Sequence, residues 1–109
     1  TIADEDLGKQ VSSLVTSSFL VRNLINTPAN DLTPETLAMA AKEIATKHKA
    51  QFKEISGKEL EKGFPLIHAV GKASENKPCL VHLTWGDPQH PKIALVGKGI
   101  LWRKIYLFT

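Results

Sequence analysis

The sequence predicts an α/β domain in which helices flank a mixed sheet. Two segments have the apolar spacing of amphipathic helices, residues 6–25 and the stretch that follows Thr33. Two later segments, residues 80–85 and 93–96, are short apolar runs typical of strands. A chain of 109 residues with 42% hydrophobic content is long enough for one domain with a real core.

The first helix is expected from Asp6 to about Ile25. One face of this helix collects its apolar residues together with a serine: Leu7, Val11, Leu14, Ser18, Val21 and Ile25. Pro28 biases Thr27 away from helical angles, so the helix should end nearby. Because a helix of this length with one apolar stripe must pack on something, we expect it to belong partly to a neighbouring domain.

The second helix has clear signals at its start. Thr33 can cap it through its hydroxyl, Pro34 suits the first helical position, and Glu35 lies in the positively polarised first turn. Its predicted apolar face carries Leu37, Ala41, Ile44 and His48.

The remaining elements are shorter. We expect a strand at residues 51–55 and a helical turn at 58–62, whereas residues 64–70 fit either a helix or a strand. The strand predicted at 80–85 ends in a Gly-Asp-Pro turn. The continuous apolar run at 93–96 is typical of a strand covered on both faces.

Composition narrows the classes of function. With 14 basic and 11 acidic residues the net charge is +3, and the lysines are scattered, so we expect no nucleic-acid partner. One cysteine, Cys79, excludes an internal disulfide framework and fits a reducing compartment. No apolar run is long enough to span a bilayer and the N-terminus lacks a secretory pattern, so we expect a soluble, cytoplasmic protein without a membrane partner.

Most candidate sites in the sequence are weak. The Gly-Lys-Gly sequence at 97–99 lacks the spacing and the hydroxyl residue of a phosphate-binding loop. No histidine pair has the helical spacing of a zinc site, which leaves a convergence of His82, Asp87 and His90 as the alternative to ordinary surface or core histidines. The prolines that follow Asp87 and His90 indicate turns. Cys79 has no obvious activator and is expected to be an inert strand residue.

Lys98 differs from these candidates. A lysine between two glycines, at the carboxyl end of the strand predicted at 93–96, can approach whatever lies at the sheet edge. Ligands of open α/β sheets gather at that edge. The alternative is a solvated lysine in a glycine turn, and the residues alone leave both interpretations open.

Three segments, taken in their order along the chain, resemble segments of a known protein family. They read Asn-Thr-Pro-Ala-Asn-Asp-Leu-Thr-Pro-Glu at 26–35, Ala-Val-Gly-Lys-Ala-Ser at 69–74 and Ile-Ala-Leu-Val-Gly-Lys-Gly-Ile at 93–100. Together they resemble the start of the catalytic domain in the leucyl aminopeptidases of the cytosolic, two-metal kind, peptidase family M17.

The resemblance implies an organisation for the whole chain. Residues 1–28 would be a long helix that leads out of a preceding domain. Residues 29–100 would be the first portion of the catalytic domain, and residues 101–109 a tail outside the family pattern.

The resemblance also implies a chemistry. Such enzymes remove N-terminal residues, often leucine, from peptide substrates with two divalent ions, zinc or manganese, and they form homo-hexamers. Lys98 occupies the position of one of the family's metal ligands. Only a neutral amine can donate a lone pair to a metal, and a dication and a low-dielectric site both favour that form of lysine.

The sequence departs from the family pattern after Ile100. The family continues with a segment similar to Thr-Phe-Asp-Ser-Gly-Gly, whose aspartate is a second metal ligand, and Arg103 stands at that position. A guanidinium is a permanent cation that cannot bind a metal. We therefore expect a truncated chain, inactive alone, whose tail comes from a frameshift, an alternative splice or a cloning artefact.

A non-enzymatic binding module on the same scaffold is the alternative. The apolar stripe of the first helix and the strand-prone run at 101–108 would then form its interaction surface. That run is apolar on every side, which also predicts self-association.

Overall fold

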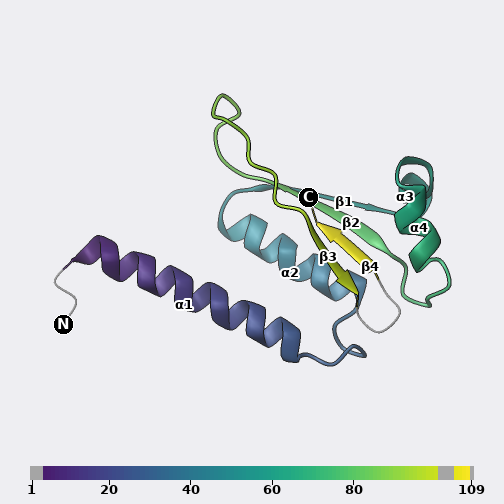
Figure 1. The fold of residues 1–109 in the computed structure, drawn as a ribbon, viewed down its shortest axis with the longest axis horizontal. Coiled ribbons are helices and arrows are strands. Elements are labelled where there is room, and N and C mark those ends of the chain that lie inside the picture. The colour runs from purple at the N-terminus through teal and green to yellow at the C-terminus, as the bar shows by residue number, and fades with distance from the viewer. Residues whose placement is uncertain (1–3, 101–104, 109) are drawn as a thin grey trace.

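The computed structural model describes residues 4–100 and 105–108 of the chain (Figure 1). The described helices are α1 (Glu5–Asn26), α2 (Pro34–Lys47), α3 (Gly57–Gly63) and α4 (Pro65–Gly71). The described strands are β1 (Gln51–Ser56), β2 (Cys79–Thr84), β3 (Gly97–Ile100) and β4 (Ile105–Phe108).

The four strands form one mixed sheet in the order β1-β2-β4-β3. β1 and β2 are antiparallel, with Ile55 opposite Leu80. β2 and β4 are parallel, and β4 and β3 are again antiparallel, so that β4 lies between β2 and β3 (Figure 1). The predicted α/β class with a mixed sheet is confirmed.

Helices cover both faces of the sheet at β2, one of its two inner strands. Successive side chains of a strand point to opposite faces. On one face Cys79 and Val81 pack with alanines of α2, while on the other Leu80 packs with α3 and α4. The result is two small cores, whose members are Ala38, Ala41, Cys79 and Val81 on the α2 face, and Ile55, Leu60, Ile67 and Leu80 on the opposite face.

The start of α2 has the capping geometry that its sequence predicts. The Thr33 hydroxyl accepts from the Thr36 backbone N–H at 3.2 Å, and the Thr36 hydroxyl accepts from the Thr33 N–H at 2.7 Å. This reciprocal capping box satisfies two backbone donors that the first turn leaves free. Pro34 begins the helix, as expected.

The buried face of α2 is rotated from the predicted one. Leu37 and Ile44 are only half-buried and His48, at the end of the helix, is exposed. Small side chains allow a helix to approach a sheet closely, and here the buried residues that contact the sheet are small ones, while Leu37 packs against this core from its margin. Buried residues of the helix are Pro34, Ala38, Ala41 and Ala45.

α1 is a single helix of 22 residues, close to the predicted bounds. The Asp4 carboxylate caps it, accepting from the backbone N–H groups of Asp6 at 2.9 Å and Leu7 at 3.3 Å. None of its residues is buried, and it runs apart from the sheet (Figure 1). No helix in the described part of the chain is long and apolar enough to cross a membrane.

The shorter predicted elements are largely confirmed. The predicted strand at 51–55 is β1, and the predicted turn at 58–62 lies within α3. The ambiguous segment at 64–70 forms the helix α4, which begins at Pro65. The strand predicted at 80–85 is β2, displaced by one residue to Cys79–Thr84.

The strand predicted at 93–96 is wrong. These residues form no regular strand, and Ile93 and Leu95 are 87% and 82% exposed. A strand has two hydrogen-bonding edges, and both edges of β2 are already occupied, by β1 and by β4. The chain consequently joins the sheet only from Gly97 onward, as the edge strand β3.

Candidate functional site

Lys98 is the second residue of β3, at the edge of the sheet. It therefore does not follow a buried strand, as the sequence predicts, but lies within an exposed one, opposite Leu107 of β4. Its side chain is open to solvent and flanked by Gly97 and Gly99. Apart from Gly97 itself and its two chain neighbours, no described residue has an atom within 4 Å of the place where a Cβ of Gly97 would be.

This setting does not fit a two-metal centre. A dinuclear site needs several donors that converge on two ions, whereas Lys98 offers one amine on an open edge. Among residues 4–100 and 105–108, the His, Cys, Asp and Glu side chains form no group of three or more that could hold a metal ion. Arg103, which replaces the expected aspartate, lies outside the described residues.

The loop after β2 has the turn chemistry that its prolines indicate. The Asp87 carboxylate accepts from the Gln89 backbone N–H at 2.9 Å, and the Asp87 carbonyl accepts from the His90 N–H at 3.1 Å. Asp87 therefore has a structural role that needs no ligand. The alternative in which Asp87, His90 and His82 converge on a metal has no support in this geometry.

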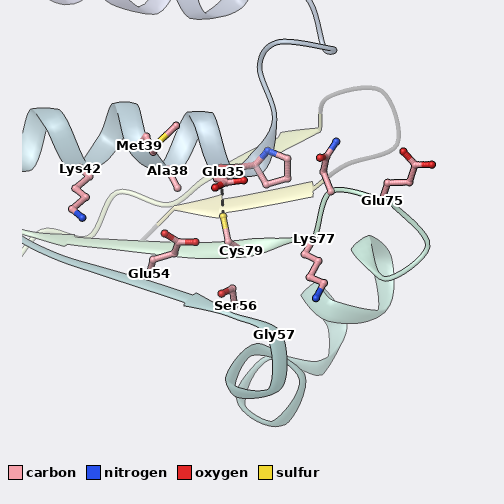
Figure 2. A pocket seen from close by; sticks show the side chains of 12 residues that line it. Glu35, Ala38, Met39, Lys42, Glu54, Ser56, Gly57, Glu75, Lys77 and Cys79 are labelled. Atoms are coloured by element: carbon pink, nitrogen blue, oxygen red, sulfur yellow. Dashed lines mark hydrogen bonds between the residues drawn. The ribbon is translucent and has the colours of Figure 1, made fainter.

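Cys79 is buried at the start of β2, under α2. Its Sγ lies 3.7 Å from the Pro34 carbonyl oxygen (Figure 2). Burial, assisted by the negative charge of Glu54, raises the pKa of the Cys79 thiol from 9.0 to about 11. Because the thiolate is the reactive form, Cys79 is a poor nucleophile at neutral pH, as its sequence context predicts.

A hollow of about 550 Å³ lies between the start of α2, the end of β1 and the loop that precedes β2 (Figure 2). Its charged lining has both signs, and it includes Glu35, Lys42, Glu54, Glu75 and Lys77. Since three carboxylates and two ammonium groups line it, the hollow presents no single charge to a ligand. Sequence reasoning missed it because its lining comes from three separate segments.

Comparisons with known proteins are consistent with this fold. Residues 19–103 match the model of the cytosol aminopeptidase family, catalytic domain. A probable cytosol aminopeptidase of Corynebacterium glutamicum is 40% identical over 99 residues, which are 89% of this chain and 20% of that protein. The corresponding protein of Corynebacterium diphtheriae is 46% identical over 83 residues, 74% of this chain and 17% of that protein.

A solved structure of a cytosol aminopeptidase is also similar to this chain. The chain is similar to the crystal structure of cytosol aminopeptidase from Coxiella burnetii, with a TM-score of 0.75 and 46% identity, over 76% of this chain and 18% of that one. It spans about a fifth of the length of the curated relatives it matches. The family match, the relatives and the shared fold together show that this chain belongs to the cytosol aminopeptidase family and carries part of its catalytic domain.

Proposed function

We propose that the chain is the first portion of the catalytic domain of a two-metal leucyl aminopeptidase that removes N-terminal residues from peptides in the cytoplasm. Two observations support this. The family match covers residues 19–103, and the names of the relatives describe cytosolic aminopeptidases. In this proposal residues 1–28 connect to a preceding domain, residues 29–100 belong to the catalytic domain, and residues 101–109 form the divergent tail.

In the complete enzyme, Lys98 is proposed to supply a neutral amine ligand to one of two divalent ions, zinc or manganese. What supports this role is the Val-Gly-Lys-Gly sequence that ends at Gly99, together with the open position of the lysine on β3. The ions would polarise a peptide carbonyl and activate a water. Peptide substrates and a homo-hexameric assembly belong to the same proposal.

The 109-residue chain alone is proposed to be inactive. A single amine cannot hold two ions, and Arg103 places a permanent cation where the family pattern requires a carboxylate. The catalytic part of the proposal therefore applies to a longer protein, and the described residues supply a scaffold and one ligand.

The source gene provides the test. Its DNA should be read in all three frames past the codon for Ile100. We expect one frame to encode a Phe-Asp-Ser-Gly-Gly-like segment followed by further acidic residues. If no frame does so, Lys98 has no metal centre to join, and the chain has to be treated as a binding module.

The binding module is the second candidate function. One observation favours it: α1 exposes a row of apolar side chains that no described element covers. In that case the α/β scaffold would only present an interaction surface.

A further inference from the structure

The divergent tail of the chain supplies an inner strand of the sheet. β4 (Ile105–Phe108) follows residue 103, where the family match ends, yet it lies between β2 and β3 (Figure 1). β4 is parallel to β2 and antiparallel to β3, and the helix α4 also lies against it. Residues outside the family match therefore take part in the fold.

A single residue of β4 is level with both of its neighbouring strands. Leu107 pairs with Leu80 of β2 on one side and with Lys98 of β3 on the other. An isolated two-stranded hairpin is only marginally stable in water. Because β3 pairs with β4 alone among the described strands, the place of β3 in the sheet depends on the pairing of β4 with β2.

We propose that β4 holds β3, and with it Lys98, at the edge of the sheet, and that it blocks the edge of β2 that β1 leaves free. A strand has only two hydrogen-bonding edges, so a further strand pairs with β2 only if β4 leaves. The position of Lys98 in this chain is thus set by residues outside the family match. The holding role stands on the strand pairing, and only the importance of Lys98 rests on the proposed function.

Hydrogen exchange of the purified 109-residue chain, followed by mass spectrometry, is the first test. We expect the amides of residues 97–100 to exchange at least about tenfold more slowly than those of 93–96, which form no strand. Leu107→Pro removes a backbone donor from an inner strand, where proline is not tolerated. It should therefore raise the exchange rate at 97–100 to that at 93–96. Protection of β1 should remain, because β1 pairs with the other edge of β2.

Ala94→Pro is the matched control. It introduces the same residue three positions before β3, in a segment that pairs with no strand. Exchange at 97–100 should then stay as slow as in the parent chain. Equal loss of protection in Ala94→Pro and Leu107→Pro would overturn the proposal, since pairing with β4 would not be the cause.

A disulfide tests the register without disturbing the backbone. Directly opposite residues of antiparallel strands have Cα atoms about 4.5–5.5 Å apart, which a disulfide can span. Lys98→Cys combined with Leu107→Cys should therefore form a disulfide within one molecule on mild oxidation, detected as a link between two tryptic peptides. Lys98→Cys combined with Tyr106→Cys should not, because position 106 is opposite Gly99 and faces the other side of the sheet. Lys98→Cys alone is the control for the buried Cys79.

Three further results would overturn the proposal. They are fast exchange at 97–100 in the parent chain, retained protection there in Leu107→Pro, and equal disulfide yields in the two double variants. If Leu107→Pro also loses the protection of β1, the disulfide yields decide. None of these measurements needs a metal or a substrate, so their failure is distinguishable from failure of the proposed function, which the source gene tests.

Discussion

Gly71 and Pro78 are in closer contact than any side chain at position 71 would allow. Gly71 is the buried last residue of α4, and a Cβ built on it would lie 2.4 Å from the Cβ and Cγ of Pro78. A buried proline ring is fixed to its own backbone and cannot turn aside. The sequence shows Gly71 only as the end of a segment, whereas the structure shows why the residue has to be glycine.

Replacing Gly71 by alanine should therefore destabilise the fold. We expect a loss of about 1–3 kcal/mol in the free energy of unfolding, measured by urea titration, because the added methyl forces Pro78 and β2 to shift. Gly63→Ala is the matched control, since a Cβ there would meet nothing within 4 Å. An equal loss in both variants would show that the contact is not the cause.

Because of Cys79, the stability of the protein should fall at alkaline pH. Its pKa is about 11 in the folded chain against 9.0 for the ordinary thiol. The folded state holds the thiol proton more tightly than the unfolded state does. The stability that the protonated thiol contributes is therefore fully present below pH 9 and is lost as the pH rises towards 11.

This dependence can be measured from the urea midpoint between pH 7 and 11. We expect the midpoint of the parent chain to fall more steeply above pH 9 than that of Cys79→Ala, which retains every other titrating group. Parallel curves for the two chains would contradict this assignment.

At the scale of elements, sequence reasoning succeeded where the cause is local. The start of α2 was predictable because Thr33 and Pro34 act on backbone groups within three residues of themselves. The turn at Asp87 was predictable for the same reason. The strand predicted at 93–96 failed, because the neighbour of β2 is decided by competition among distant segments, and the segment at 105–108 takes that place.

Loss of the capping box of α2 should measurably lower the free energy of unfolding. Thr33→Ala removes the hydroxyl that accepts from the Thr36 N–H, and should lower the free energy of unfolding by about 1 kcal/mol. Thr46→Ala is the control, because the Thr46 hydroxyl at the far end of α2 bonds only the Lys42 carbonyl and is exposed. The idea fails if Thr46→Ala costs as much as Thr33→Ala in the same urea titration.

At the scale of the whole molecule, the chain is wider than a compact domain. Its radius of gyration is 16.3 Å. A compact chain of about 100 residues has a radius of about 13 Å. The difference reflects α1, which runs apart from the sheet (Figure 1). The predicted need of this helix for a partner came from its stripe, but the identity of the partner cannot be derived from periodicity alone.

In the candidate site, too, features that depend on residues close in sequence could be predicted, and features that depend on distant residues could not. The Val-Gly-Lys-Gly sequence singled out Lys98, yet one lysine on an edge strand does not make a metal centre. A centre of that kind is assembled from donors far apart in sequence. The hollow beside Cys79 was likewise hidden from sequence reasoning, because its three lining segments meet only in the folded chain.

The most direct measurement is hydrolysis of a leucyl anilide by the purified 109-residue chain, with zinc or manganese added. We expect no release of aniline above that of the metal alone, and no change on Lys98→Ala. Metal-dependent release that Lys98→Ala abolishes would contradict it, because Lys98 would then act in a working metal centre within this chain.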